Sequence, residues 1–537
     1  MTTETVHPGA AADPAAAPPS RPTATGRRPD RTGPRAPRAW ASKAAVNTVL
    51  IMLTLYTLMP ISWLLIAATK NRRDLFACSA RRTGRVGGGV EPVRAAAAGA
   101  PGEGDSRYVM SHRMMFLRRA ASAAALLVTV LPVVVASPAH AADGGSACRP
   151  PASVPLDAEQ ARLADARSTA LVERAGFGDF VRRFPAALCT TRSPAEAERL
   201  LVSWGQALWQ ASVLRAQGQR PGGDLTPGDD RPLYWARLGM TAELARWQPK
   251  FTVDRAALRA RFEDASRGLT DNAFRTAPGV RRIFISGFDP FGLDAEIRRA
   301  NPSGSAALQL NGRRVTLADG SPAEIRAVVL PVRYADFDAG MVERAFAPRL
   351  AAGPASADII TTVSQGYPGI FTLEDWAGRA RSADPYPDNA RALSGGTRER
   401  PVTAPGLGPG PEFIRTTLPA NAVTAAVQTP YPVLLNTEVT EIPAGGTAPV
   451  DRADGPTPGS RAVAGGGGGY LSNEVAYRSN RLRAELAPHL PGGHLHTPVL
   501  TGLPADPQLL TGPEFERNES AITAEVRAVL EHAAVRR

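Results

Sequence analysis

From Arg281 to the C-terminus, the sequence alternates between apolar segments of strand length and amphipathic segments of helix length. Continuous apolar runs typical of buried strands occur in "RRIFISGF", "AEIRAVVLPV" and "ADIITTVSQ", with shorter ones in "YPVLLNT" and "HLHTPVL". Helical patterns such as "ADFDAGMVERAFAPRL" and "NEVAYRSNRLRAELAPHL" lie between them. This alternation predicts an α/β fold, a three-layer α/β/α sandwich with a mostly parallel twisted sheet. In such sheets, ligand sites form beyond the carboxyl ends of the strands.

A helical region precedes this part of the chain. Between residues 156 and 278, the segments "LDAEQARLADARSTALVERAG", "SPAEAERLLVSWGQALWQASVLRAQG" and "TVDRAALRARFEDASRGL" place apolar side chains at helical spacing. Ser193 to Glu196 form a capping box with a proline at the first helical position, which predicts a helix start. No catalytic constellation occurs here, so we interpret the region as an accessory or pro-segment-like module. We expect four tryptophans to fill its core: Trp204, Trp209, Trp235 and Trp247.

The N-terminal part carries two targeting signals. Residues 45–69 contain no charged side chain and are long enough to cross a bilayer as a helix, but basic residues flank both ends and give no orientation. Residues 114–141 have the layout of a signal peptide, with a basic start, an apolar stretch and an Ala-His-Ala cleavage site. A signal peptide has no function in the interior of a chain. Our hypothesis is that the start is misassigned or two reading frames were fused, and that the working protein begins near Ala142.

The expected cellular location of the protein depends on where translation starts. A protein that begins near Ala142 is secreted or extracytoplasmic, whereas translation from Met1 leaves it anchored in the membrane. Residues 38–76 resemble the first membrane helix of sugar-transporter permease subunits of the ATP-binding-cassette class. No further hydrophobic span follows, so we do not expect transport. In an oxidising compartment, Cys148 and Cys189 form either a single disulfide or remain as two unpaired buried cysteines.

Composition excludes several classes of protein. Hydrophobic residues make up 43% of the 537 residues and charged residues 21%, as in globular proteins, while 50 glycines and 49 prolines imply long irregular stretches. The net charge of +12 comes largely from arginines near the N-terminus, in Pro/Ala/Gly-rich sequence typical of a disordered arm. No basic groove with interleaved aromatics is present, so we expect no nucleic-acid partner. None of the three cysteines lies in a CxxC pair, which argues against a zinc site.

These observations predict a chain organised in seven parts. They are a disordered basic arm (1–44), a transmembrane helix (45–69), a disordered linker (70–113), a signal-peptide-like segment (114–141), a linker (142–155), the helical module (156–278) and the α/β domain (281–537) with an insertion at about 438–465. Membrane contact is expected only through the N-terminal segment.

Six segments of the α/β part follow one another in the order of a known enzyme family. They are "GFDPFG" with a following "NPS", "LPVRY", "SQGYPGIFTLEDWAGRARSADPYPDN", "TTLP", "GGYLSNEVAY" and "GHLHTP". Together they resemble pyroglutamyl peptidase type I, the pyrrolidone-carboxylate peptidases, over about residues 281–535. The resemblance implies a peptidase that removes N-terminal pyroglutamate without a cofactor. It makes Glu374 the catalytic acid, Ser472 the residue at the nucleophile position and His496 the base.

The chemistry of these three side chains is coherent without the family. His496 takes the proton from Ser472, while Glu374 orients the imidazole and stabilises its cation. Ser472 is also well placed as a helix cap, because serine is a favoured capping residue. His494 and His496 lie on one predicted strand, and we expect only one of them to face a site. As an H-x-H pair they suggest a metal site, but no third ligand is apparent in the sequence.

Substrate binding requires an apolar slot for an uncharged lactam ring. The resemblance implies that Phe288 and Phe291 supply this slot, although both are also suited to anchoring the turn from the core. Asn301, Gln365 and Leu471 are the further candidate substrate contacts, and turn hydrogen bonding is an equally good role for Asn301 and Gln365. The expected partner is a peptide with an N-terminal pyroglutamate.

The sequence departs from the family at four places. Ser472 replaces the family's cysteine, Asp375 replaces the usual arginine after the glutamate, and "QGYPGIF" replaces a glycine-arginine loop. The insertion, Glu438 to Gly465, is rich in Gly, Pro and Asp. We interpret Gly465 to Gly467 as the end of a flexible insertion. These departures leave three functions open: a serine-variant peptidase, a catalytically silent relative that binds blocked peptide ends, and an amidase or esterase of altered specificity.

Overall fold

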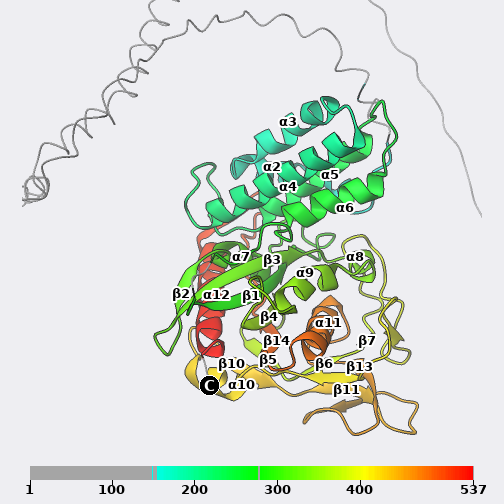
Figure 1. Ribbon diagram of the computed structural model, residues 1–537, viewed down its shortest axis with the longest axis vertical. Helices are drawn as coiled ribbons and strands as arrows, with labels where there is room; N and C mark the ends of the chain where they lie inside the picture. Colours follow the sequence, from blue (N-terminus) through cyan, green and yellow to red (C-terminus); the bar gives the residue numbers. More distant parts are fainter. Residues whose placement is uncertain (1–147, 149–153, 276–277, 536–537) are drawn as a thin grey trace, which may run out of the picture. The chain divides into compact units, whose positions relative to one another are not determined.

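The computed structural model describes residue 148 and residues 154–275 and 278–535 (Figure 1). The predicted arm, transmembrane helix, linker and signal-peptide-like segment, residues 1–141, lie outside the described residues. Among the helices of the described part, none is long and apolar enough to cross a membrane.

Residues 160–266 form a bundle of helices, as the apolar spacing predicts. The elements are η2 (Gln160–Ala164), α2 (Ala166–Arg174), α3 (Gly178–Cys189), α4 (Pro194–Ala216), α5 (Arg231–Arg246) and α6 (Arg255–Ser266). Ser193 caps α4 by accepting from the Glu196 amide, while the Glu196 carboxylate accepts from the backbone of Arg192. The predicted core tryptophans are confirmed: Trp209, Trp235 and Trp247 are buried, and Trp204 packs against the same core.

A disulfide joins Cys148 to Cys189, the last residue of α3, with their Cα atoms 5.8 Å apart. The disulfide alternative of the two that the sequence left open is therefore confirmed.

A seven-stranded sheet forms the centre of the C-terminal part. Its order is β10 (Val433–Asn436), β5 (Phe371–Glu374), β14 (Gly492–Thr497), β4 (Ile359–Gln365), β1 (Arg281–Phe288), β3 (Pro322–Leu330) and β2 (Arg314–Thr316). Four neighbouring pairs are parallel. The pairs β14–β5 and β2–β3 are antiparallel. The sheet is therefore mostly parallel but mixed, and the prediction of an α/β fold is confirmed.

Helices cover both faces of this sheet (Figure 1). On one face, α7 (Pro302–Leu310) packs against β1 and β3, and α12 (Pro513–Ala533) packs against α7. The short α10 (Ala420–Ala426) packs against α12 and β10. On the other face lie α9 (Met341–Leu350) and α11 (Leu471–Leu486), preceded by the short α8 (Tyr334–Asp338). The sequence pattern suggested one helix over α8 and α9, but Gly340 between them has a left-handed φ of 77°, which ends the first helix.

Three smaller sheets are formed by the residues between β5 and α11. The insertion is ordered into β11 (Val439–Ile442), β12 (Val450–Arg452) and β13 (Arg461–Ala464), an antiparallel sheet with β11 in the middle. Two short antiparallel pairs lie beside it: β6 (Trp376–Gly378) with β9 (Phe413–Arg415), and β7 (Ala380–Arg381) with β8 (Val402–Thr403).

Candidate active site

The centre of the candidate site is a buried hydrogen bond between Glu374 and His496. Glu374 ends β5, His496 lies near the end of β14, and these antiparallel neighbours bring the carboxylate Oε1 within 2.8 Å of the imidazole Nδ1. Both residues are at most 4% exposed. Because a carboxylate only accepts, Nδ1 carries the proton and Nε2 is left as the basic nitrogen.

Two further donors hold the Glu374 carboxylate in place. The Thr372 hydroxyl donates to Oε1, and the Asn436 amide donates to Oε2 at 2.7 Å. Sequence reasoning missed both residues. Asn436 stands at the end of the "LLNT" strand, where a polar side chain after an apolar run was the available signal. With its lone pairs occupied, the carboxylate orients the imidazole without freedom to rotate.

The glycine run passes directly over this pair. A Cβ atom on Gly466 would lie 2.0 Å from Oε2 of Glu374, and one on Gly467 would lie 3.3 Å from Cε1 of His496. A Cβ on Gly465 would lie 2.3 Å from Oδ1 of Asn473. The interpretation of Gly465 to Gly467 as the end of a flexible insertion is therefore wrong. A Cβ would clash at Gly465 and Gly466, so glycine is required at these two positions, whereas at Gly467 a Cβ would fit only tightly.

Ser472 follows this run as the second residue of α11. Its hydroxyl donates to the Gly467 carbonyl at 2.9 Å, and the side chain is half-buried. The helix cap is Tyr470, so the alternative role of Ser472 as a cap is wrong. Gly467 accepts from Ser472 and passes close to the His496 ring, but within the described residues no hydrogen bond joins the two side chains.

Buried polar contacts fix the start of α11. Asn473 accepts from the Gly378 amide at 2.8 Å and donates to the carbonyls of Gly378 and Ala380. Arg381 forms an ion pair with Glu474 through Nε and Nη2, at 2.6 and 2.8 Å. Both α11 side chains are less than 5% exposed, so the position of Ser472 is held by its two successors in the chain.

His494 lies on the same face of β14 as His496. Their rings are 4.6 Å apart, and the two Nε2 atoms are separated by 3.4 Å. The prediction that only one histidine faces the site is wrong, because side chains two residues apart in a strand point to the same side. Hydroxyls of Thr362 and Ser364 bind the two ring nitrogens of His494. Burial and the neighbouring His496 hold the pKa of His494 well below its ordinary value of 6.5, so the ring is neutral.

Comparison with known proteins identifies the family of this chain. The family described as PA0049 N-terminal domain matches residues 139–263, and the family described as PA0049, C-terminal domain matches residues 282–411 and 435–501. The uncharacterized protein PA0049 of Pseudomonas aeruginosa is 34% identical, over 70% of this chain and 86% of that protein. The chain belongs to the PA0049 family.

Two solved structures are similar to part of this PA0049 family member. Pyroglutamyl peptidase I of Bacillus amyloliquefaciens is 21% identical, over 47% of this chain and 97% of that chain, with a TM-score of 0.30. The pyrrolidone carboxyl peptidase of Thermococcus litoralis is 17% identical, over 48% of this chain and 99% of that chain, also with a TM-score of 0.30. The aligned part is less than half of the PA0049-family chain in both cases.

The predicted substrate contacts of this PA0049-family protein fall into two groups. Phe288, Phe291 and Leu471 belong to one apolar cluster on the α9–α11 face of the sheet. Phe288 is 3% exposed and stacks on Phe337, and Leu471 is 1% exposed, so both are core residues and Phe291 alone is half-buried. The suggestion that Phe288 and Leu471 contact a substrate finds no support in these positions.

The two polar candidates also differ. Asn301 is 1% exposed and caps α7, with its side chain bonded to Ser303 and to the Asp289 carbonyl, so its groups are used within the fold. Gln365 is half-buried at the end of β4, and its Oε1 accepts from the Leu500 amide at 3.3 Å. The next residue, Gly366, lies against the His496 side chain. Gln365 is therefore the polar candidate beside the Glu374–His496 pair.

The arrangement is suited to proton transfer at a half-buried hydroxyl. A neutral imidazole with a fixed Nε2 accepts a proton, and a carboxylate on Nδ1 stabilises the cation that results. Among the described residues, no group of three or more His, Cys, Asp or Glu is placed to hold a metal ion.

Proposed function

We propose that this protein is a hydrolase that removes N-terminal pyroglutamate from peptides through an acyl-enzyme on Ser472. The observation that carries the proposal is the buried Glu374–His496 hydrogen bond beneath the glycine run that leads into Ser472. The ordered sequence segments that resemble pyroglutamyl peptidase type I support the choice of substrate.

The reaction begins with a rotation of the Ser472 side chain away from the Gly467 carbonyl toward His496. As Oγ attacks the carbonyl carbon of the pyroglutamyl residue, its proton passes to Nε2 of His496, and Glu374 stabilises the imidazolium. Ser472 lies in the first turn of the 16-residue helix α11, whose partial positive charge favours the developing oxyanion. The leaving amine takes the proton from His496, and water then hydrolyses the ester by the same route.

Serine makes this chemistry slower than cysteine in a site built for a thiol. A thiol of pKa about 8.5 ionises readily beside an imidazolium, whereas a hydroxyl loses its proton only during attack. A loss of about 4 kcal/mol of transition-state stabilisation corresponds to about a thousandfold in rate. The proposed enzyme is therefore slow, and its activity depends on the Glu374–His496 pair.

The test is hydrolysis of a chromogenic pyroglutamyl amide by the purified protein and two matched variants. Ser472→Ala should abolish activity, and Ser472→Cys should retain or increase it. Activity in the parent that Ser472→Ala leaves unchanged would refute the nucleophile. A prolyl or alanyl amide serves as the control for lactam specificity, and preferential turnover of that control favours an amidase or esterase instead.

A second candidate function is binding without turnover. Its support is that the Ser472 hydroxyl is engaged by Gly467 and that Nε2 of His496 faces His494 rather than Ser472. In that case the parent is silent and binds a pyroglutamyl peptide in calorimetry, and Ser472→Cys alone gains activity. Silence and absence of binding in every form would exclude both functions.

We also propose that the working protein is exported and begins near Ala142. The signal-like segment at residues 114–141 and the Cys148–Cys189 disulfide support this, because disulfides persist in oxidising compartments. Mass spectrometry of the native N-terminus tests it. Peptides from residues 1–110 in the same molecule as the C-terminal half would contradict it.

A further inference from the structure

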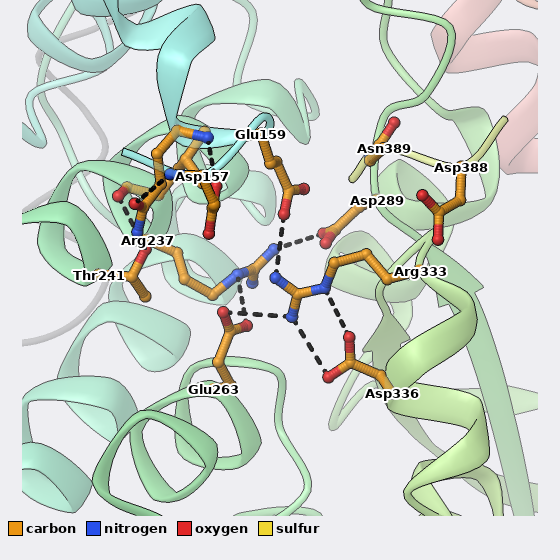
Figure 2. A network of polar contacts seen from close by, with 12 residues as sticks. Asp157, Glu159, Arg237, Thr241, Glu263, Asp289, Arg333, Asp336, Asp388 and Asn389 are labelled. Atoms are coloured by element: carbon orange, nitrogen blue, oxygen red, sulfur yellow. Dashed lines mark hydrogen bonds and ion pairs between the residues drawn. The ribbon is translucent and has the colours of Figure 1, made fainter. Parts of the chain in front are cut away.

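Arginines of the helical region reach into the turn that follows β1. We call residues 287–294 the recognition turn; they comprise the last two residues of β1 and the turn after it, and they contain the "GFDPFG" motif. Asp289 within it is 2% exposed and accepts from Arg237 of α5 (Figure 2). It also accepts from Arg267, which follows α6. Arg162 of η2 binds Asp294 through Nε and Nη2, at 2.9 and 2.8 Å. Asp289 is therefore held by arginines of the helical region, and Asp294 is shared between Arg162 of the helical region and Arg391 of the α/β part.

A second arginine cluster links the same helices to the segment after β3. Figure 2 shows Arg333, of the "LPVRY" motif, between Glu159 and Glu263 of the helical region and Asp336 of α8. Burial alone raises the pKa of Glu263, but the guanidinium groups of Arg333 and Arg267 outweigh burial and hold its pKa well below the ordinary range. Glu263 therefore stays charged and is shared by arginines of both parts of the chain.

The backbone of the recognition turn is held from the "PDN" motif, which the helical region also contacts. Asn389 donates to the Pro290 carbonyl at 2.8 Å, and Arg162 donates to the Asn389 carbonyl at 2.6 Å. Asp388 accepts from the Tyr334 amide at 2.7 Å. Three motif segments that are distant in sequence therefore meet the helices at one buried place (Figure 2).

The apolar core is continuous across the same boundary. One cluster of buried residues runs from Leu171 and Trp235 in the helices to Ile285 in β1 and Val526 in α12. Arg231, at the start of α5, is fully buried and donates to the carbonyls of Arg298 and Leu510. A detachable segment does not share a core in this way, since its release would expose apolar surface and unpaired buried charges.

We propose that the helical region is a permanent half of the enzyme and positions the recognition turn through Arg237 and Arg267, rather than being a pro-segment that is removed. Arg237 and Arg267 are positioning residues, because they act on the turn through Asp289 and not on the reacting atoms. The substrate part of this inference rests on the proposed function, since the turn affects KM only if it contributes to the lactam site.

The first test is a cut between the two parts of the full chain. A recognition sequence for a site-specific protease is inserted between Pro278 and Gly279, both exposed, where a side chain at Gly279 would meet no atom within 4 Å. After cleavage, the two fragments should elute together in gel filtration at low salt and in 1 M NaCl. Release of the helical fragment without denaturant, with or without a rise in activity, would overturn the proposal.

The second test removes the charge that the two arginines hold. Asp289→Asn keeps the volume of the side chain. The matched control is Asp336→Asn, which lies in the same network but, among the described residues, forms its ion pair with Arg333 alone. Hydrogen exchange of residues 287–294 should become about tenfold faster in Asp289→Asn and stay unchanged in Asp336→Asn. Faster exchange throughout the protein, without preference for the turn, would show a structural role only and contradict positioning.

The kinetic readout separates this inference from the proposed function. If the parent hydrolyses a pyroglutamyl amide, Asp289→Asn should raise KM about tenfold, equal to about 1.4 kcal/mol of binding, with kcat unchanged. An equal fall in kcat with unchanged KM would contradict a positioning role in recognition. If no form is active, the proposed function fails, while the cleavage and exchange experiments still decide the role of the helical region.

Discussion

Glu519 is a buried carboxyl whose proton should make the stability of the protein depend on pH near neutrality. It lies on α12, is 1% exposed, and its Oε2 has no hydrogen-bond partner among the described residues. Burial, with the charge of Asp229 second, raises its pKa from 4.5 to about 8. The geometry agrees, because Ser305 faces both Glu519 Oε1 and the Gly228 carbonyl with one hydroxyl hydrogen. A protonated Glu519 donates to Ser305, which then donates to Gly228.

The sign follows from the raised pKa. Between pH 4.5 and pH 8 the folded protein holds a proton that the unfolded chain has lost, so the stabilising contribution is complete below pH 4.5 and disappears as the pH rises to 8. A difference of one proton changes the free energy of unfolding by about 1.4 kcal/mol per pH unit. Glu519→Gln is neutral at every pH and its amide donates to Ser305 in the same way. Relative to this variant, the parent should lose about 2–3 kcal/mol between pH 5.5 and 7.5.

The assay is urea unfolding of both proteins at half-unit steps from pH 5 to 8.5. Asp230, another buried acid, is present in both proteins. Burial and then the charges of Asp229 and Glu519 raise its pKa, so the difference between the two proteins reports residue 519 together with its effect on Asp230. The matched control is Glu525→Gln on the same helix, because burial raises the pKa of Glu525 only to about 6. The difference in the free energy of unfolding between the parent and this variant should therefore stop changing above about pH 6. Parallel profiles for the parent and Glu519→Gln between pH 6 and 8 would show that Glu519 is ionised in the fold and refute the reasoning.

Two predictions concern the site itself. Gly466→Ala places a Cβ 2.0 Å from the Glu374 carboxylate, so it should lower kcat about ten- to hundredfold, the cost of one charge-assisted hydrogen bond. Gly468→Ala is the control, because a Cβ there meets no atom of the described residues within 4 Å. The left-handed φ of 78° at this position costs an alanine only about 1–2 kcal/mol of stability. Equal losses of kcat in the two variants would contradict the close approach of Gly466 to Glu374. Burial and the neighbouring His496 keep the folded protein from protonating His494, whereas the unfolded chain binds this proton below pH 6.5. The free energy of unfolding of the parent should therefore fall as the pH drops below 6.5, and it should fall less in His494→Phe. Urea midpoints that fall equally in the parent and this variant from pH 6.5 to 5 would contradict it.

The sequence predicted the elements better than their directions. Continuous apolar runs marked β1, β3 and β4 as buried strands, and buried strands they are. Phe371–Glu374 was not among the predicted strands, and apolar runs carry no information on strand direction, so the antiparallel pairing of β5 with β14 was not predicted. In that pairing Glu374 lies opposite His494 and Thr372 lies opposite His496, so the Glu374 carboxylate reaches His496 diagonally across the two strands.

Local sequence also could not reveal the polar contacts between distant segments. Asn436 and Glu374 are 62 residues apart, and Arg237 and Asp289 are 52 residues apart. Arginine and asparagine are usually exposed residues, so their burial is visible only once the fold has brought their partners together. The erroneous expectation for His494 had a different origin, because the two-residue period of a strand already places it beside His496.

The serine and the disulfide follow from one physical requirement of the compartment that we propose. Cys148 and Cys189 are the only cysteines in the described residues, and both are bonded to each other. An oxidising environment that maintains this bond also exposes an activated thiolate to sulfenic acid formation or exchange with other disulfides. Within the part of the chain that the structure describes, a half-buried cysteine at position 472 would be the one free thiol available to that chemistry, whereas a serine there is inert to it. In the enzyme that we propose, serine is therefore the nucleophile that resists oxidation in the compartment of the disulfide, and the Glu374–His496 pair has to supply the activation that a thiol provides by itself.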